Sequence, residues 1–156
     1  MAASGRELSL ETTEPDQTRP EGLTDAEQIR FVGTEWRTVR LEGDDLILSV
    51  ALSKPLAEGV TLSTYLFGYR SDRPFAAMPK IHVEVGALST AVYDQSRKLH
   101  GAAVQVRRDA RAIVMRAPLA LLGEPERALV AAHTYLGDVP LDAAAWRVLD
   151  LSAARP

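Results

Sequence analysis

Hydrophobic and polar residues alternate with a period of two through most of the chain after residue 30. The clearest case is the segment 45–53, where Leu46, Leu48, Val50 and Leu52 fall on one face and smaller or polar residues fall on the other. Such alternation is typical of a strand with one buried face. Further strands are predicted at residues 36–41, 60–69, 81–85, 88–93, 99–107, 112–117, 128–136 and 146–151.

The segments between these strands carry the residues that turns require. Glu42-Gly43-Asp44-Asp45 predicts a hairpin that joins the strand 36–41 to the strand 45–53. Residues 118–123 begin with Pro and end with Gly, which predicts a short helical turn, and further candidates for one lie at 24–29 and 141–145. We therefore expect an all-β protein, an antiparallel two-sheet β-sandwich of jelly-roll type with one or two short helical turns.

Residues 1–22 differ in composition from the rest. They are polar, with five acidic and two basic side chains and two prolines, which predicts a flexible acidic tail. Leu8 and Leu10 alternate with polar neighbours, so a short edge strand there is the alternative. The sandwich domain is expected over residues 23–152, and residues 153–156 form the C-terminal end.

Composition and charge narrow the classes of function. The 156 residues suffice for one domain with a substantial core. The formal net charge of −3 argues against nucleic acid as a partner, since that binding needs a basic face. The absence of cysteine excludes disulfides and thiol chemistry.

The same sequence bears on location. No apolar run is long enough for a membrane span, and residues 1–17 lack the features of a secretory signal. We therefore expect a soluble protein, cytoplasmic by default unless an export segment is missing. Abundant Ala, and basic charge carried mostly by Arg, are typical of a GC-rich bacterial genome.

Three segments together resemble the DOMON-like and family-nine carbohydrate-binding-module-like β-sandwiches: the turn and strand at 42–50, the hairpin at 65–85, and the strand at 112–117 that runs into the Pro-containing turn ending at Gly123. A later strand at 129–136 and Trp146 follow in the expected order. The resemblance covers about residues 31–151. It implies a two-sheet sandwich of a superfamily whose members bind sugars or, in some branches, haem, and that often serves as an accessory domain beside catalytic domains.

Sugar binding needs flat aromatic rings flanked by planar polar groups. The aromatic candidates are Trp36, Tyr65, Tyr69, Tyr93 and Trp146, and the polar candidates are Arg70, Asp72, Arg73 and Asp142. Tyr65, Phe67 and Tyr69 share one strand face, about 6.6 Å apart at the ordinary rise of a strand. The alternative is that these rings form the core layer between the two sheets, and that Trp36 and Trp146 are buried as well.

The loop Arg70-Ser71-Asp72-Arg73-Pro74 is the densest polar cluster of the central hairpin. Arginine can bind carboxylates or sugar hydroxyls through two N–H groups at once. The alternative is that Arg70, Asp72 and Arg73 pair with one another on the surface. The candidate ligand-binding residues are Tyr65, Tyr69, Arg70, Asp72, Arg73 and Trp146.

Other chemistries find little support. His82, His100 and His133 lack the spacing of a zinc site, and no Cys-x-x-Cys-His motif attaches a haem. Acidic turns such as Asp44-Asp45 could take calcium but are common in loops. No serine sits in a nucleophile motif. The sequence therefore predicts a non-catalytic binding module without metal or cofactor, with carbohydrate as its ligand. The alternative is a structural or protein-interaction domain of the same fold, and an enzyme is the minority interpretation.

Overall fold

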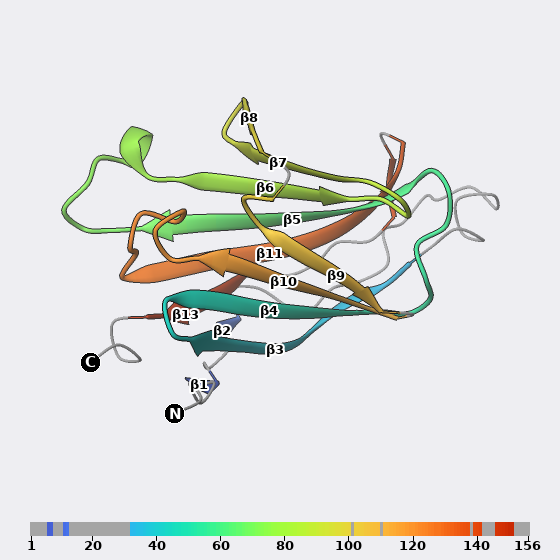
Figure 1. Ribbon diagram of the computed structural model, residues 1–156, viewed down its shortest axis with the longest axis horizontal. Coiled ribbons are helices and arrows are strands. Elements are labelled where there is room, and N and C mark those ends of the chain that lie inside the picture. The colour runs from blue at the N-terminus through green and yellow to red at the C-terminus, as the bar shows by residue number, and fades with distance from the viewer. Residues whose placement is uncertain are drawn as a thin grey trace.

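Two antiparallel sheets pack face to face in the computed structural model of the chain (Figure 1). The smaller sheet has the order β1 (Arg6–Glu7), β3 (Thr34–Glu42), β4 (Asp45–Leu52), β10 (Ala112–Pro118), β9 (Gln105–Asp109). The larger sheet has the order β2 (Glu11–Thr12), β13 (Arg147–Asp150), β11 (Arg127–Leu136), β5 (Val60–Tyr69), β6 (Lys80–Val85), β7 (Thr90–Asp94), β8 (Arg97–Leu99), and β12 (Val139–Pro140) pairs with β11. One 3₁₀ turn, η1 (Phe75–Ala77), lies between β5 and β6. The prediction of an all-β two-sheet sandwich is confirmed.

The structure describes residues 6–7, 11–12, 32–100, 102–109, 111–137, 139–141 and 146–151. Within the predicted tail, β1 pairs with β3 and β2 pairs with β13. Leu8 and Leu10, the predicted helical turn at 24–29, and residues 142–145 of the turn predicted at 141–145, Asp142 among them, lie outside the described residues. The tail as a whole stays a prediction.

The core lies between the sheets and follows the period-two pattern. In β4, Leu46, Leu48 and Val50 are fully buried, as the alternation predicts. Leu62 and Leu66 of β5 are buried on the inner face of the larger sheet. Trp36 of β3 pairs with Val50 and belongs to the same core. The predictions of an inward face on β4 and of a buried Trp36 are therefore confirmed.

One predicted strand is divided between the two sheets. Residues 99–107 were expected to form one strand, but β8 ends at Leu99 in the larger sheet and β9 begins at Gln105 in the smaller sheet. The backbone N–H groups of Ala102 and Ala103 donate to the ring Nδ1 and the carbonyl of His100, which turns the chain between them. Val104, which the pattern placed within a strand, is a buried core residue of this crossing.

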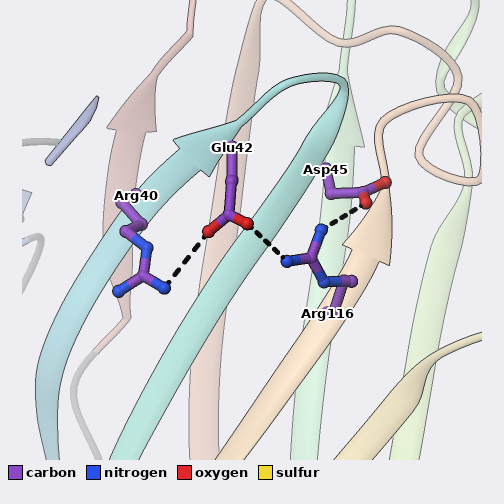
Figure 2. Close-up of polar contacts among 4 residues, drawn as sticks. All are labelled: Arg40, Glu42, Asp45 and Arg116. Carbon is purple, nitrogen blue, oxygen red and sulfur yellow. Dashed lines mark hydrogen bonds and ion pairs between the residues drawn. The ribbon is translucent and has the colours of Figure 1, made fainter. Parts of the chain in front are cut away.

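The β3–β4 hairpin is joined to β10 by ion pairs (Figure 2). Gly43 has a φ of +61°, a left-handed conformation that suits glycine. In the register of the two strands, Glu42 lies opposite Asp45 across the predicted turn. Arg116 of β10 donates from Nη1 to Asp45 Oδ2 at 2.6 Å and from Nη2 to Glu42 Oε1 at 2.8 Å. Arg40 Nη2 donates to the other oxygen of Glu42 at 3.2 Å. One guanidinium thus connects both strands of the hairpin to β10.

The first prediction concerns the core. Leu48→Ala should lower the free energy of unfolding by about 2–5 kcal/mol, because it removes buried methyl groups and leaves a cavity. Denaturant unfolding measures this, with exposed Lys98→Ala on β8 as the control. A loss under about 0.5 kcal/mol would contradict an inward Leu48, since burial of even one methyl group exceeds that value.

The second prediction concerns Gly68 of β5, whose backbone N–H donates to the carbonyl of Pro79. A Cβ at this position would collide with the carbonyl oxygen of Leu122, in the turn between β10 and β11. Gly68→Ala should therefore destabilise the fold by about 1–3 kcal/mol, the usual cost of overpacking. Gly43→Ala adds the same methyl group at a positive φ, where nothing lies within 4 Å. It therefore introduces backbone strain without a collision, whereas Gly68→Ala introduces the collision. Equal stability of Gly68→Ala and the parent would show that the carbonyl of Leu122 leaves room for a methyl group at residue 68.

The third prediction concerns acid stability. The hydrogen bond from Arg116, followed by that from Arg40, lowers the pKa of Glu42 below its ordinary value of 4.5. A lowered folded-state pKa gives stability that is present above the unfolded value and is lost as pH falls through the folded value. Glu42→Gln should thus lower the melting temperature at pH 7, and the difference from the parent should narrow below about pH 4.5. Glu35→Gln, an exposed change on the same strand, is the matched control. A difference independent of pH would mean that Glu42 acts by packing alone.

Candidate functional site

The three rings of β5 lie on the outer face of the larger sheet. Leu62, Leu66 and Gly68 are buried against the core, so the residues between them point outward. Tyr65, Phe67 and Tyr69 are each half-buried on that outer face. The alternative that these rings form the layer between the sheets is therefore wrong. Antiparallel sheets usually present polar side chains on the face away from the core, so an aromatic outer face is unusual.

Tyr65 belongs to an aromatic row that crosses the strands. His82 lies opposite it on β6, and Tyr93 lies opposite His82 on β7. The rings of Tyr65 and His82 are stacked, with centroids 4.4 Å apart and planes 8° from parallel. Tyr93 is 6.0 Å from His82, and Trp146 is 6.3 Å from Tyr65 on the other side. We call Trp146, Tyr65, His82 and Tyr93 the aromatic row.

A small residue lies next to Tyr65 of the aromatic row. Ala131 of β11 is the partner of Tyr65 in the ladder and therefore also points outward. Its side chain is nevertheless fully buried, which means that larger neighbours cover it. The ring of Tyr65 lies within 6.3 Å of both Trp146 and His133, the two rings nearest this position on the β11 side. The outer face therefore carries a second, smaller apolar layer above the sheet.

The stacking of Tyr65 on His82 also determines which parts of the two rings are exposed to solvent. Neighbouring strands lie about 4.8 Å apart, close to the centroid separation of Tyr65 and His82. Their planes thus stand upright on the sheet and present edges, because each ring covers a face of the other. Beside this pair is a hollow of about 310 Å³. It is lined by Thr61, Ser63, Tyr65, His82, Glu84, Tyr135 and Gly137.

The hollow offers hydroxyl, imidazole and carboxylate groups on one side of the stacked pair. Burial raises the pKa of Tyr65, and the nearby Tyr135 adds to this effect. Burial lowers the pKa of His82, against the opposing effect of Glu84, so the imidazole is neutral at pH 7. Its Nδ1 lies 3.8 Å from Glu84 Oε1, too far for a hydrogen bond, and its buried Nε2 has no hydrogen-bond partner. His82 therefore keeps hydrogen-bonding capacity that the fold does not use.

The polar loop after β5 is largely occupied with contacts of its own. Arg70 donates from Nε and Nη2 to the two carboxylate oxygens of Asp72, at 2.8 and 2.6 Å. Its Nη1 donates to the carbonyl of Glu124 at 2.9 Å. The guanidinium of Arg73 lies over Gly123, where no side chain stands in the way. Arg70 and Asp72 thus pair with each other, as the surface-pairing alternative predicted, and Arg70 also ties the loop to the turn before β11.

The predicted site residues therefore fall into two groups. Tyr65 and Trp146 meet in the aromatic row, whereas Tyr69, Arg70, Asp72 and Arg73 lie at the end of β5. Tyr65 and Tyr69 are four residues apart on one strand, about 13 Å at the ordinary rise. Among the described residues, the hollow beside the aromatic row includes Tyr65 but none of the second group.

Several residues of the hollow were not singled out by the sequence. Ser63, Glu84 and Tyr135 carried no motif, and His82 was considered only as a metal ligand. The alternation did put His82 on the outward face of its strand, which is correct. Only the pairing register between β5 and β6, which a single sequence does not contain, places it against Tyr65.

The described part of the chain holds no group of three or more His, Asp and Glu side chains placed to bind a metal ion. Across the same residues, no helix has the length and apolar character needed to cross a membrane.

Three comparisons with known proteins complete the description of the site. The chain matches no protein-family model, no curated protein and no solved structure. The resemblance to DOMON-like and family-nine carbohydrate-binding-module-like sandwiches therefore stays a prediction, and function has to be argued from the site itself.

Proposed function

We propose that this chain is a non-catalytic binding module that takes a carbohydrate on the outer face of its larger sheet, in the hollow beside the aromatic row. The observation that carries the proposal is the lining of that hollow. The stacked pair Tyr65–His82 forms one wall, and hydroxyl and carboxylate groups of Ser63, Tyr135 and Glu84 stand beside it. A volume of about 310 Å³ lies within the range of small-molecule sites.

The chemistry of a sugar suits this lining. Pyranose rings combine apolar C–H faces with hydroxyls that both donate and accept hydrogen bonds. The apolar surface of the Tyr65 ring that borders the hollow can contact the C–H groups, while Ser63, Tyr135 and Glu84 can exchange hydrogen bonds with the hydroxyls. His82 lines the same hollow, although its buried Nε2 is closed to a ligand in this structure.

A protein-interaction domain of the same fold is the second candidate. Two large apolar side chains on the loops at either end of β6 favour it. Leu88 is 99% exposed and Phe75 is 69% exposed. Exposed apolar side chains of this size are common at protein contacts, although single ones also occur on ordinary surfaces.

The fourth prediction tests the hollow. A glycan array identifies a ligand of the parent chain, and titration then compares Tyr135→Phe with Tyr93→Phe. Both changes remove one phenol hydroxyl from the same face, but only Tyr135 lines the hollow. Tyr135→Phe should weaken binding about two- to tenfold, the usual net effect of one hydrogen bond, and Tyr93→Phe should leave it unchanged.

Two outcomes would overturn the proposal. One is the absence of any glycan that binds at millimolar strength, after which Leu88→Ser and Phe75→Ser would test the protein-interaction alternative by their effect on partner capture. The other is equal binding by the parent and by Tyr135→Phe. Glycan binding by Arg73→Ala is measured alongside. If Arg73→Ala weakens binding and Tyr135→Phe does not, the site is in the loop after β5 and not in the hollow.

A further inference from the structure

A second and larger hollow lies on the opposite outer face of the molecule. It is a groove of about 460 Å³ in the outer face of the smaller sheet. The strand register orders its lining, apart from Val106, into two neighbouring rows. The first row is Arg40, Ile47, Arg116 and Gln105, and the second is Thr38, Ser49, Val114 and Arg107.

The groove combines an apolar floor with three guanidinium groups. Ile47 is only 5% exposed although it points away from the core, because it lies between Arg40 and Arg116 and their aliphatic stems cover it. Val114 extends this floor on β10. The described lining contains Arg40, Arg107 and Arg116 but no carboxylate.

The ion pairs at the hairpin end hold two of these arginines in place. Glu42 and Asp45 contact Arg116 from the side of the turn, and Glu42 also holds Arg40 (Figure 2). A guanidinium has five N–H groups, so each of these arginines keeps donors beyond those in the ion pairs. Arg107, at the far side of the groove, is 72% exposed, and its ion pair with Asp109 is loose at 3.6 Å.

We propose that this groove binds a small amphiphilic anion, in its simplest form a carboxylate on a hydrocarbon chain. The carboxylate lies among the guanidinium groups of Arg40, Arg107 and Arg116, and the hydrocarbon lies along Val114 and the aliphatic arginine stems above Ile47. Arginine forks match the planar geometry of a carboxylate, and their fixed orientation reduces the entropy lost on binding. Because Glu42, Asp45 and Asp109 offset much of the local charge, we expect a millimolar affinity that depends on hydrogen-bond geometry.

The test uses the full chain with two probes of the same shape. Sodium hexanoate and the uncharged hexanamide are titrated at constant ionic strength, and the backbone amide shifts are followed by ¹⁵N NMR. We expect saturable shifts with hexanoate on β4, β9 and β10, and clearly weaker binding of hexanamide. Shifts confined to β5 and β6 would place the probe on the aromatic face and overturn the proposal.

Two variants supply the matched comparison. Arg107→Gln should weaken hexanoate about three- to tenfold, the effect of one exposed charge-assisted contact. Arg97→Gln on β8 is the control, since Arg97 is 76% exposed and has a similarly loose pair with Asp94 at 3.8 Å. Three results would each overturn the anion site and leave the ion pairs with a structural role alone. They are equal effects of the two variants on hexanoate binding, equal affinity of the parent for hexanoate and hexanamide, and no saturable shift up to 50 mM, a ceiling about tenfold above the expected millimolar range. The result does not depend on whether a glycan binds the larger sheet.

Discussion

The pairing of β5 with β11 is the constraint on which the larger sheet depends. Both strands are ten residues long and pair along their full length, from Val60 opposite Leu136 to Tyr69 opposite Arg127. Because side chains alternate between the faces, this register settles the inner and outer faces together. A slip of one residue in β5 would turn Tyr65 into the core and Leu66 out of it. The same ladder therefore secures the core and the aromatic row.

The two outer faces of the sandwich differ in chemistry because they are built from different residue classes. On the larger sheet, rings stack across strands above the small Ala131, and the result is a half-buried aromatic layer with a hollow beside it. On the smaller sheet, arginines stand on three strands, and Ile47 is buried between two of them, Arg40 and Arg116. Rings exclude water and favour ligands with C–H surface, whereas guanidinium groups favour oxygen anions. One domain thus presents two surfaces of distinct chemistry.

Contacts between distant segments hold the ends of the strands. Arg116 joins the β3–β4 hairpin to β10, while Arg70 and Ser71 join the loop after β5 to Glu124 and Glu126 before β11. These contacts are exposed or partly buried, so each contributes modestly to stability. Their structural effect is to position loops and hairpins that the core itself does not reach. In the polar loop after β5, Arg70, Ser71 and Asp72 are all engaged in such contacts.

The amino-acid sequence by itself determined most of the fold. Alternation in 45–53 identified the inward face of β4, and Glu42-Gly43-Asp44-Asp45 identified the hairpin, because both depend on local geometry that a few neighbouring residues define. The strand expected at 99–107 was wrong because its apolar pattern continues across a turn, and Val104 is buried at a crossing between sheets rather than within a strand. Local pattern alone does not distinguish these two kinds of burial.

The candidate sites were decided by tertiary structure. Tyr65 and Trp146 were recognisable from residue type, but His82, Glu84 and Tyr135 joined them only through strand register. Whether the rings faced the core or solvent also depended on which face of β5 met the smaller sheet. The arginine groove was invisible in the sequence, since Arg40, Arg107 and Arg116 lie far apart along the chain and share a face only through β4 and β10. Alternation places a side chain on one of two faces, whereas pairing between distant strands determines its neighbours.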